Sequence, residues 1–302
     1  MIKDFEDLMK AARHQKKMRL AVAAAEDMDV LQAVKEATLA GIILPVLVGE
    51  KEKIKAIARE IDFDISEVPL VEGTTLEESA RISVRMVHDS EADFLMKGLI
   101  DTSVLLKAVL DKTYGLRTDS QLSHVMIYGS ENYHKLLFLT DGGMNISPNL
   151  EEKVRIVSNA VAMAKALGIE TVKVAALAAK EKVNPKMQAT VDAAELQTLC
   201  EKGEFGEGVI LEGPLALDLA ISEKAAQIKK FKSRIAGDAD VLLVPTIEMG
   251  NGIGKTLTYL AKAESAGVIM GAKAPIVLVS RADSYEAKLY SIALGSVVAA
   301  NL

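Results

Sequence analysis

The stretch Ala274-Pro-Ile-Val-Leu-Val-Ser-Arg-Ala-Asp283 indicates which fold class this chain adopts. Its apolar and β-branched residues are typical of a buried strand, and a helical pattern follows over residues 285–294. A strand that leads directly into a helix is the repeating unit of an open α/β sheet. We therefore expect Ser280 and Arg281 at the carboxyl edge of a sheet, where such folds bind ligands. The Arg281 guanidinium suits a phosphate or carboxylate; a capped helix with a surface arginine is the alternative.

The same alternation of strand and helix runs along the rest of the chain. Short β-branched runs predict strands at residues 20–24, 42–48, 94–96, 173–177, 209–211, 241–244 and 276–279. Apolar residues at helical spacing predict helices at residues 30–40, 51–61, 76–87, 104–110, 150–167 and 187–202. Thr75 and Asn149 each stand three residues before a glutamate, as in a helix-capping box. These patterns predict an α/β protein with mainly parallel strands and helices on both faces.

One segment breaks this alternation. Two strand-like runs, residues 122–127 and 135–139, are joined by a polar loop. This pattern predicts a hairpin at the point where one domain ends and another begins. No linker rich in proline, glycine or serine separates the two parts. We therefore expect two domains that pack tightly around a cleft.

The composition excludes several classes of function. With 302 residues, of which 50% are hydrophobic, the chain can form one large or two medium-sized domains. A net charge of -6, 4% aromatic residues and no tryptophan argue against a nucleic-acid partner. No apolar run reaches the roughly 20 residues of a membrane span, and the N-terminus lacks a signal segment, so we expect a cytoplasmic protein without a membrane partner. The single cysteine, Cys200, and four histidines without metal-ligand spacing predict no metal site.

A glycine-rich segment suggests an anion site. The sequence Val244-Pro-Thr-Ile-Glu-Met-Gly-Asn-Gly-Ile-Gly-Lys-Thr256 predicts a strand, a loop and then a helix, and the loop would offer Asn251 and Lys255 to a ligand. A P-loop needs glycine where Met249 stands, so that motif is incomplete. Two alternatives stay open: an ordinary glycine-rich turn, and a nucleotide site built on Gly254-Lys255-Thr256.

Two further segments place polar groups directly after a strand. A strand ends at Asp141, and the two glycines that follow would let the backbone approach a ligand close to Asn145. Lys97 ends another strand, and Lys107 lies on the helix after it. The alternatives are an ordinary loop and solvated surface lysines. In the functional interpretation, both lysines surround an anion together with Lys255 and Arg281.

Six motifs occur in order along nearly the whole chain. The most specific are Glu212-Gly-Pro-Leu-Ala-Leu-Asp218 and Val279-Ser-Arg-Ala-Asp283. The others are Thr140-Asp-Gly-Gly-Met-Asn-Ile-Ser-Pro148, Ala179-Lys-Glu-Lys-Val-Asn184, Gly237-Asp-Ala-Asp240, and Gly250-Asn251 with Lys255. This set resembles the family of phosphate acetyltransferases and phosphate butyryltransferases, and it is most similar to the butyryltransferase branch.

The resemblance implies a fold and an assembly. It implies two α/β domains of the isocitrate/isopropylmalate dehydrogenase type with the active site in the cleft between them. Residues 1–118 and 273–302 would form the first domain, and residues 119–272 the second, inserted one. It also implies a homodimer or a larger homo-oligomer.

The resemblance further implies the reaction acyl-CoA + phosphate = acyl phosphate + CoA, with a butanoyl or branched acyl group. Arg281, Lys107 and Lys97 would bind phosphate, and Ser280 would stand beside the sulfur of CoA. Asp141, Asn145, Asn251 and Lys255 would line the substrate cleft. CoA would be a substrate, and no cofactor would be bound tightly.

The proton acceptor for the CoA thiol is the weakest part of the resemblance. The acetyltransferase branch has an aspartate seven positions after the serine, where this chain has Ala287. Glu286 and Asp283 are the nearest replacements, and Glu248 is another. A second arginine of the acetyltransferase site has Arg81 and Arg85 as candidates. The alternatives are a phosphate acetyltransferase, a nucleotide-binding protein, and an acyl-CoA or phosphate sensor without turnover.

Overall fold

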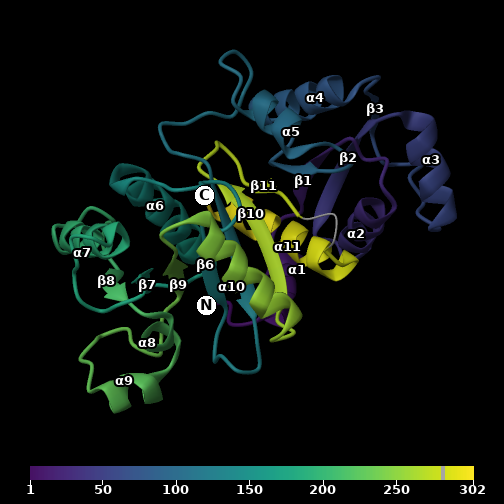
Figure 1. The fold of residues 1–302 in the computed structure, drawn as a ribbon. Coiled ribbons are helices and arrows are strands. Elements are labelled where there is room, and N and C mark those ends of the chain that lie inside the picture. Colours follow the sequence, from purple (N-terminus) through teal and green to yellow (C-terminus); the bar gives the residue numbers. More distant parts are fainter. Residues whose placement is uncertain (280–282) are drawn as a thin grey trace. The chain divides into compact units, whose positions relative to one another are not determined.

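The computed structural model describes residues 1–279 and 283–302 (Figure 1). The chain divides into two compact units. Unit 1 comprises Met1–Asp4 and Gln121–Ser265, and unit 2 comprises Phe5–Ser120 and Ala266–Leu302. Both units are α/β, as the alternating pattern predicts.

The strands of unit 2 follow the order β3-β2-β1-β4-β11-β10. Neighbouring strands are parallel, except that β10 is antiparallel to β11. Their bounds are β1 (Met18–Ala23), β2 (Ile43–Gly49), β3 (Leu70–Glu72), β4 (Phe94–Lys97), β10 (Glu264–Met270) and β11 (Ile276–Val277). The parallel strands define a carboxyl edge, where ligands bind in such folds, and an amino edge opposite to it.

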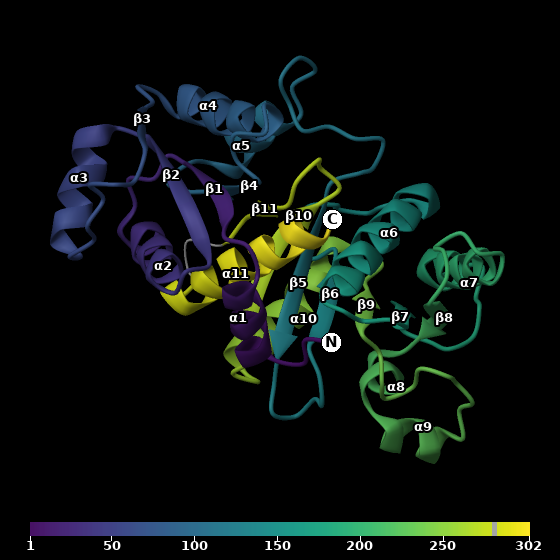
Figure 2. The ribbon, with the colours of Figure 1, turned by 180° about the vertical axis from the view of Figure 1, so that it is seen from behind.

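Two groups of helices cover the faces of the unit 2 strands. The helices α1 (Phe5–His14), α2 (Met28–Leu39) and α11 (Tyr285–Asn301) pack together on one face, which Figure 2 shows from their side. The helices α4 (Leu76–His88) and α5 (Thr102–Val109) pack together on the other, and α3 (Lys51–Glu60) follows β2 (Figure 1). Because α4 follows β3 and α5 follows β4, both helices begin at the carboxyl edge and end toward the amino edge.

The strands of unit 1 follow the order β5-β6-β9-β7-β8. They are β5 (Ser123–Gly129), β6 (Leu137–Thr140), β7 (Val172–Leu177), β8 (Val209–Leu215) and β9 (Val241–Leu243). The hairpin β5–β6 is antiparallel, and the other pairs are parallel. The helices α6 (Leu150–Ala166) and α7 (Gln188–Glu201) contact each other, whereas α8 (Leu217–Ile221), α9 (Glu223–Lys229) and α10 (Ile247–Tyr259) share a second apolar cluster.

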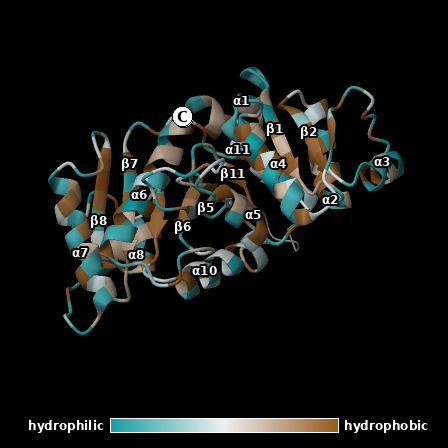
Figure 3. Ribbon diagram, turned by 90° about the horizontal axis from the view of Figure 1, so that it is seen from above, coloured by the Kyte–Doolittle hydropathy of each residue, from teal (hydrophilic) through white to brown (hydrophobic). Residues whose placement is uncertain are grey.

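Hydrophobic residues concentrate on the strands, and hydrophilic residues lie on parts of the helices that cover them (Figure 3). Phe94 on β4 and Phe138 on β6 are fully buried, one in each unit. Gly295 lets α11 approach the strands, since a Cβ there would lie 2.8 Å from the side chain of Val277 and 3.0 Å from that of Phe94. Within the described residues, no helix has the length and apolar character needed to cross a bilayer.

The sequence patterns predicted most of these elements. The predicted hairpin and all seven predicted strands are confirmed, as are the six predicted helices. The patterns missed β3, β10, α1, α8 and α9. β3 has only three residues, and β10 reads Glu-Ser-Ala-Gly-Val-Ile-Met, in which the small residues weaken the strand signal.

Both predicted helix starts are N-caps, but only one has a full capping box. The Asn149 side chain accepts from the Glu152 N–H at 3.0 Å, and the Glu152 carboxylate accepts from the Asn149 N–H at 2.8 Å. At α4, the Thr75 hydroxyl accepts from the Glu78 N–H at 3.1 Å. The Glu78 carboxylate turns to Thr74 instead, where it accepts from the N–H and from the hydroxyl.

Candidate functional site

The residues that the sequence places first, Ser280 and Arg281, lie outside the described residues. The elements on either side of them are described. β11 lies parallel to β4, so the chain leaves it at the carboxyl edge of unit 2. The helix α11 begins at Tyr285, capped by the Ser284 hydroxyl, which accepts from the Ala287 N–H at 3.3 Å.

Glu286 and Asp283, the predicted proton acceptors, have different surroundings. Glu286 is exposed in the first turn of α11. A hydrogen bond with the Ser284 side chain lowers the pKa of Glu286, so this carboxylate is ionised at neutral pH. Asp283 is half-buried, and its backbone carbonyl accepts from the Lys288 ammonium at 2.5 Å. Of the two, Glu286 offers the more accessible carboxylate.

Lys97 directs its ammonium group into its own loop. The residue ends β4 and is 7% exposed, and its Nζ donates to the carbonyl oxygens of Gly98 at 3.1 Å and Ile100 at 2.8 Å. Gly98 is required beside it, because an added Cβ would lie 2.1 Å from the Ala24 carbonyl oxygen at the end of β1. The Lys-Gly pair thus organises the carboxyl edge where β4 meets β1.

Lys107 lines a pocket of about 580 Å³ between α4 and α5. Arg81, one of the two candidate second arginines, lines the same pocket, together with Ser103 from the first turn of α5. Arg85 does not line it and instead lies 4.0 Å from Asp89. The pocket also contains the carboxylates of Glu77, Glu78 and Asp111, so it presents both signs of charge.

The carboxylate of Asp141 accepts hydrogen bonds on both of its oxygens from groups within unit 1. The residue is 2% exposed, and its two oxygens accept from the N–H groups of His124, Gly143 and Met144 and from the Asn145 side chain, at 2.6–3.1 Å. Asn145 in turn donates to the Leu122 carbonyl at 3.0 Å and accepts from the Gln121 side chain at 2.5 Å. Both side chains hold the loop after β6 in shape; contact of either with a ligand stays a prediction.

The glycine-rich segment is a helix, and the prediction of a loop there is wrong. Residues 247–259 form α10, and the glycines allow close packing. A Cβ on Gly250 would lie 2.6 Å from the Cα of Gly142, and a Cβ on Gly254 would lie 2.6 Å from the hydroxyl of Tyr128. The glycines therefore bring α10 onto the loop after β6 and onto β5, where a phosphate-cradling loop was expected.

Asn251 and Lys255 lie one turn apart on α10, and both are exposed. The Lys255 ammonium stands 5.8 Å from the centre of the Tyr259 ring, within cation–π range. The helix thus carries an exposed amide, an exposed cation and an exposed aromatic ring. No sequence motif points to Tyr259, although its spacing of four residues from Lys255 is a usable signal.

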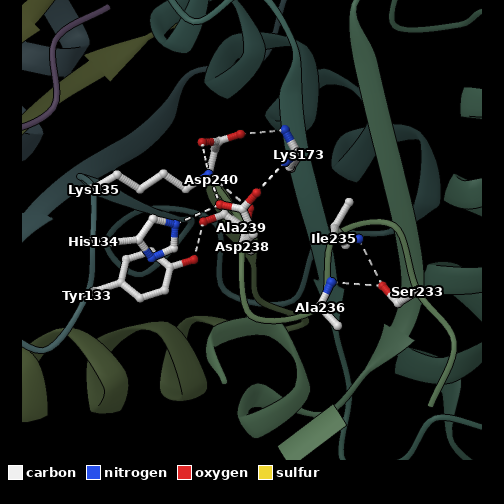
Figure 4. A network of polar contacts seen from close by, with 10 residues as sticks. All are labelled: Tyr133, His134, Lys135, Lys173, Ser233, Ile235, Ala236, Asp238, Ala239 and Asp240. Carbon is white, nitrogen blue, oxygen red and sulfur yellow. Dashed lines mark hydrogen bonds and ion pairs between the residues drawn. The ribbon is translucent and has the colours of Figure 1, made fainter. Parts of the chain in front are cut away.

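The motif Gly237-Asp-Ala-Asp240 builds a network of ion pairs at the amino edge of the unit 1 strands (Figure 4). Asp240 is 2% exposed; it pairs with Lys135 at 2.6 Å and accepts from the backbone N–H of Lys173 at 2.7 Å. Asp238 pairs with Lys135 at 2.8 Å, with His134 at 2.8 Å and with Lys173. We call these five residues the amino-edge network. They tie the hairpin to β7 and to the start of β9.

Charge pairing shifts the pKa of Asp238. Partial burial acts to raise it, but hydrogen bonds from Lys135, Lys173 and His134 together hold the pKa well below its usual range. Beside the network, burial raises the pKa of Tyr133, whose hydroxyl donates to the Ala239 carbonyl at 2.6 Å. Asp238 and Tyr133 each keep one protonation state at neutral pH, which suits a structural function.

The motif Glu212-Gly-Pro-Leu-Ala-Leu-Asp218 also holds its own unit together. The Glu212 carboxylate accepts from the Ser233 hydroxyl at 2.5 Å and from the Arg234 N–H at 3.0 Å. Lys229 lies 2.9 Å from both Asp218 and Glu181. The motif therefore fixes the segment between α9 and β9.

A buried ion pair joins α6 to α7. Lys153 and Asp192 are 5% and 6% exposed, and their charged atoms lie 2.5 Å apart. The Gln188 side chain donates to the second oxygen of Asp192 at 2.7 Å. The sequence does not predict this pair, because 39 residues separate the partners and no local pattern links them. Within the described ranges, no cluster of three or more His, Cys, Asp or Glu side chains is arranged to hold a metal ion.

The fold and these motifs define a class of acyltransferases. A model of the phosphate acetyl/butaryl transferase family matches residues 4–82 and 73–296 of the chain. The chain belongs to this family. A probable phosphate butyryltransferase of Bacillus subtilis is 50% identical over 96% of both chains. A phosphate acetyltransferase of Thermotoga maritima is 44% identical over 97% of this chain and 99% of its own length.

Solved structures agree with the family assignment. A branched-chain phosphotransacylase from Enterococcus faecalis has a TM-score of 0.83 at 32% identity, covering 94% of this chain and 100% of its own. A 4-hydroxythreonine-4-phosphate dehydrogenase from Burkholderia phymatum has a TM-score of 0.56 at 13% identity, covering 94% and 99%. The second similarity concerns the fold alone, and it agrees with the predicted dehydrogenase type.

Proposed function

We propose that this enzyme transfers a butanoyl or branched short acyl group between CoA and inorganic phosphate. The observation that carries the proposal is the identity of 50% to a probable phosphate butyryltransferase over nearly the full length. The similarity to a branched-chain phosphotransacylase supports the same acyl class. Among the residues named, Arg281 and Lys107 bind phosphate, whereas Lys97 acts through the loop that it organises.

In the proposed reaction, a phosphate oxygen attacks the thioester carbonyl directly. The new C–O bond forms as the C–S bond breaks, and the CoA thiolate leaves. Arg281 and Lys107, with Arg81 in the same pocket as Lys107, hold the anion in the attacking position, which supplies proximity. Ser280 donates a hydrogen bond to the developing oxyanion or to the leaving thiolate. No acyl-enzyme forms, because phosphate is itself the nucleophile.

In the reverse direction, the CoA thiol must lose its proton before it attacks the acyl phosphate. A thiol with a pKa of about 8.5 is mostly protonated at neutral pH, so a base that accepts this proton speeds the reaction. We assign this step to Glu286, because its carboxylate is exposed in the first turn of α11, beside the segment that follows β11, and is ionised and so able to accept a proton. Asp283 and Glu248 are the alternative acceptors. Glu248 is exposed in the first turn of α10.

We assign CoA binding in unit 1 to the exposed face of α10. Lys255 offers a cation for the phosphate groups of CoA, Tyr259 offers a ring for stacking, and Asn251 offers a hydrogen-bonding amide. Asp141 and Asn145 act beneath this face by holding the neighbouring loop. CoA is a substrate in this scheme, and no tightly bound cofactor takes part.

The deciding experiment measures release of free CoA from butanoyl-CoA, with isobutanoyl-CoA and acetyl-CoA in parallel. We expect release only when phosphate is present, with the largest kcat/KM for the four-carbon donors. Arg281→Ala should lower the rate of CoA release by at least about 100-fold. Equal release without phosphate would indicate a thioesterase and would reject the proposal.

Phosphate acetyltransferase activity is the second candidate, since a phosphate acetyltransferase is 44% identical to the chain. A kcat/KM for acetyl-CoA above that for butanoyl-CoA would select it. The nucleotide-binding alternative loses its basis, because Gly254-Lys255-Thr256 lies inside α10 and Gly254 packs against Tyr128.

We also infer a homodimer or larger homo-oligomer that works in the cytoplasm. The family resemblance supports this assembly. Light scattering of the purified protein measures its mass directly. A mass of one chain, 32.4 kDa, would contradict the inference.

A further inference from the structure

A second pocket of unit 2 gathers positive charge away from the carboxyl edge. Its volume is about 250 Å³, and its lining includes His88, Lys112, Arg117 and Lys273 with a single carboxylate, Asp111. His88 ends α4, and Lys273 lies between the end of β10 and the start of β11, which places the pocket at the amino edge. We call it the amino-edge pocket.

The cations of this pocket have no ion-pair partner in the part of the chain that the structure describes. Within residues 1–279 and 283–302, neither Lys112 nor Arg117 nor Lys273 takes part in an ion pair. Asp111 uses one oxygen to accept from the backbone N–H groups of Thr113 at 2.7 Å and Tyr114 at 3.2 Å. Three cations therefore face one carboxylate in a chain whose net charge is -6.

The backbone around the pocket is held in place. The Leu116 N–H donates to the Val109 carbonyl at 2.7 Å, and the Leu116 carbonyl accepts from the Lys273 N–H at 2.9 Å. His88 Nδ1 donates to the Gly115 carbonyl at 3.0 Å, because a carbonyl oxygen only accepts. Gly115 is required, since a Cβ would lie 2.3 Å from the Asp111 carbonyl oxygen. A preformed rim lets a ligand bind without the cost of ordering the loop.

We propose that the amino-edge pocket binds a multivalent phosphate anion. Arginine and lysine on a fixed rim recognise phosphate oxygens, Arg117 bidentately and both lysines as point charges. The volume equals about eight water molecules at about 30 Å³ each, which fits a diphosphate group better than a whole nucleotide. A nucleotide would therefore place its diphosphate in the pocket and leave its base outside.

The test is calorimetric titration of the full chain with pyrophosphate at low salt. A Lys107→Ala background removes a residue of the proposed substrate site from the measurement. In that background we compare Arg117→Ala/Lys273→Ala with Arg59→Ala/Lys224→Ala, which removes the same charges from exposed positions elsewhere. We expect at least a tenfold weaker Kd only in the first pair. Equal Kd values for both pairs would overturn the proposal.

A third variant and a second ligand make the result decisive. Lys112→Gln changes one exposed side chain and should weaken pyrophosphate binding about threefold. This single variant keeps the site testable if the double variant fails to fold. ADP in place of pyrophosphate distinguishes the source of the phosphate groups. ADP binding that falls with Arg117→Ala/Lys273→Ala indicates an organic diphosphate, whereas binding of pyrophosphate alone indicates a free one. No binding of either ligand to the Lys107→Ala protein would also reject the site.

Discussion

The amino edges of the two units use charge in opposite ways. In unit 1, Lys135 and Lys173 meet Asp238 and Asp240 in a network that also includes His134 (Figure 4). Among the described residues that line the unit 2 pocket, Lys112, Arg117 and Lys273 face one carboxylate, Asp111, which accepts from backbone N–H groups of its own turn. The first set joins strands, and the second is left available to a ligand.

This difference shows that a charged motif does not by itself identify a ligand site. Gly237-Asp-Ala-Asp240 is one of the motifs that resemble the family, yet all its charges are paired within unit 1. Lys112, Arg117 and Lys273 belong to no motif. The pairing of a side chain in the structure, more than its place in a motif, separates a structural function from a binding function.

Breaking the unit 1 network should have the largest effect on stability. Asp240→Ala removes one of the two carboxylate partners of Lys135, whose side chain is 14% exposed, and also leaves the backbone N–H of Lys173 without its acceptor. We expect a loss of about 3–5 kcal/mol in the free energy of unfolding, measured by urea titration. Asp119→Ala, at an exposed position, is the control and should change it by less than about 0.5 kcal/mol. A loss below 1 kcal/mol for Asp240→Ala would mean that the network is not structural.

Removing a pocket cation of unit 2 should affect binding and leave the fold intact. Lys107→Ala should raise the KM for phosphate by about 10- to 100-fold, since a hydrogen bond to a charged group contributes about 1.5–3 kcal/mol. The urea midpoint should stay unchanged, because Lys107 makes no ion pair within the described part of the chain. Lys51→Ala serves as the matched control. An unchanged KM would remove Lys107 from the site.

Two glycines of α10 should respond to alanine with opposite signs. Gly250→Ala places a Cβ 2.6 Å from the Cα of Gly142 and should cost about 1–3 kcal/mol through overpacking. Gly252→Ala meets no atom within 4 Å and should stabilise the helix by up to about 1 kcal/mol. Thermal unfolding of both variants measures this difference. Equal shifts would contradict the packing assigned to α10.

Acid should weaken unit 1 through Asp238. The pKa of Asp238 is lowered in the fold, so its contribution is complete above the unfolded value of about 3.9 and is lost as the pH falls toward the folded value. We expect the urea midpoint of unfolding to decrease as the pH is lowered below about 4. Asp238→Asn should make the urea midpoint less dependent on pH in this range. An unaltered slope in Asp238→Asn would assign the acid sensitivity to other carboxylates.

The strand and helix patterns were readable because local periodicity reports burial. The hairpin and the cap at Asn149 follow from neighbouring residues, and the structure has both. The prediction of a loop at the glycine-rich segment was wrong, because glycine is common both in loops and where a helix packs closely against its neighbour. Only the position of Gly142 and Tyr128 in space distinguishes these uses.

Side-chain partners from distant segments could not be read from the sequence. Lys97 looks like a ligand for an anion, but its ammonium donates within its own loop. The buried pair Lys153–Asp192 and the amino-edge pocket both join segments that lie far apart in the chain. Sequence patterns indicate which residues are polar after a strand, and tertiary contacts decide which of them remain available.

The backbone contact of Gly142 with Gly250 sets limits on redesign of this enzyme. A library aimed at a new acyl group gains nothing by varying these two positions, because any side chain at one of them meets the main chain of the other. Position 252 on the same helix is open and tolerates larger residues. Mutagenesis can therefore vary position 252 on the exposed turn of α10 while the layer beneath it stays fixed.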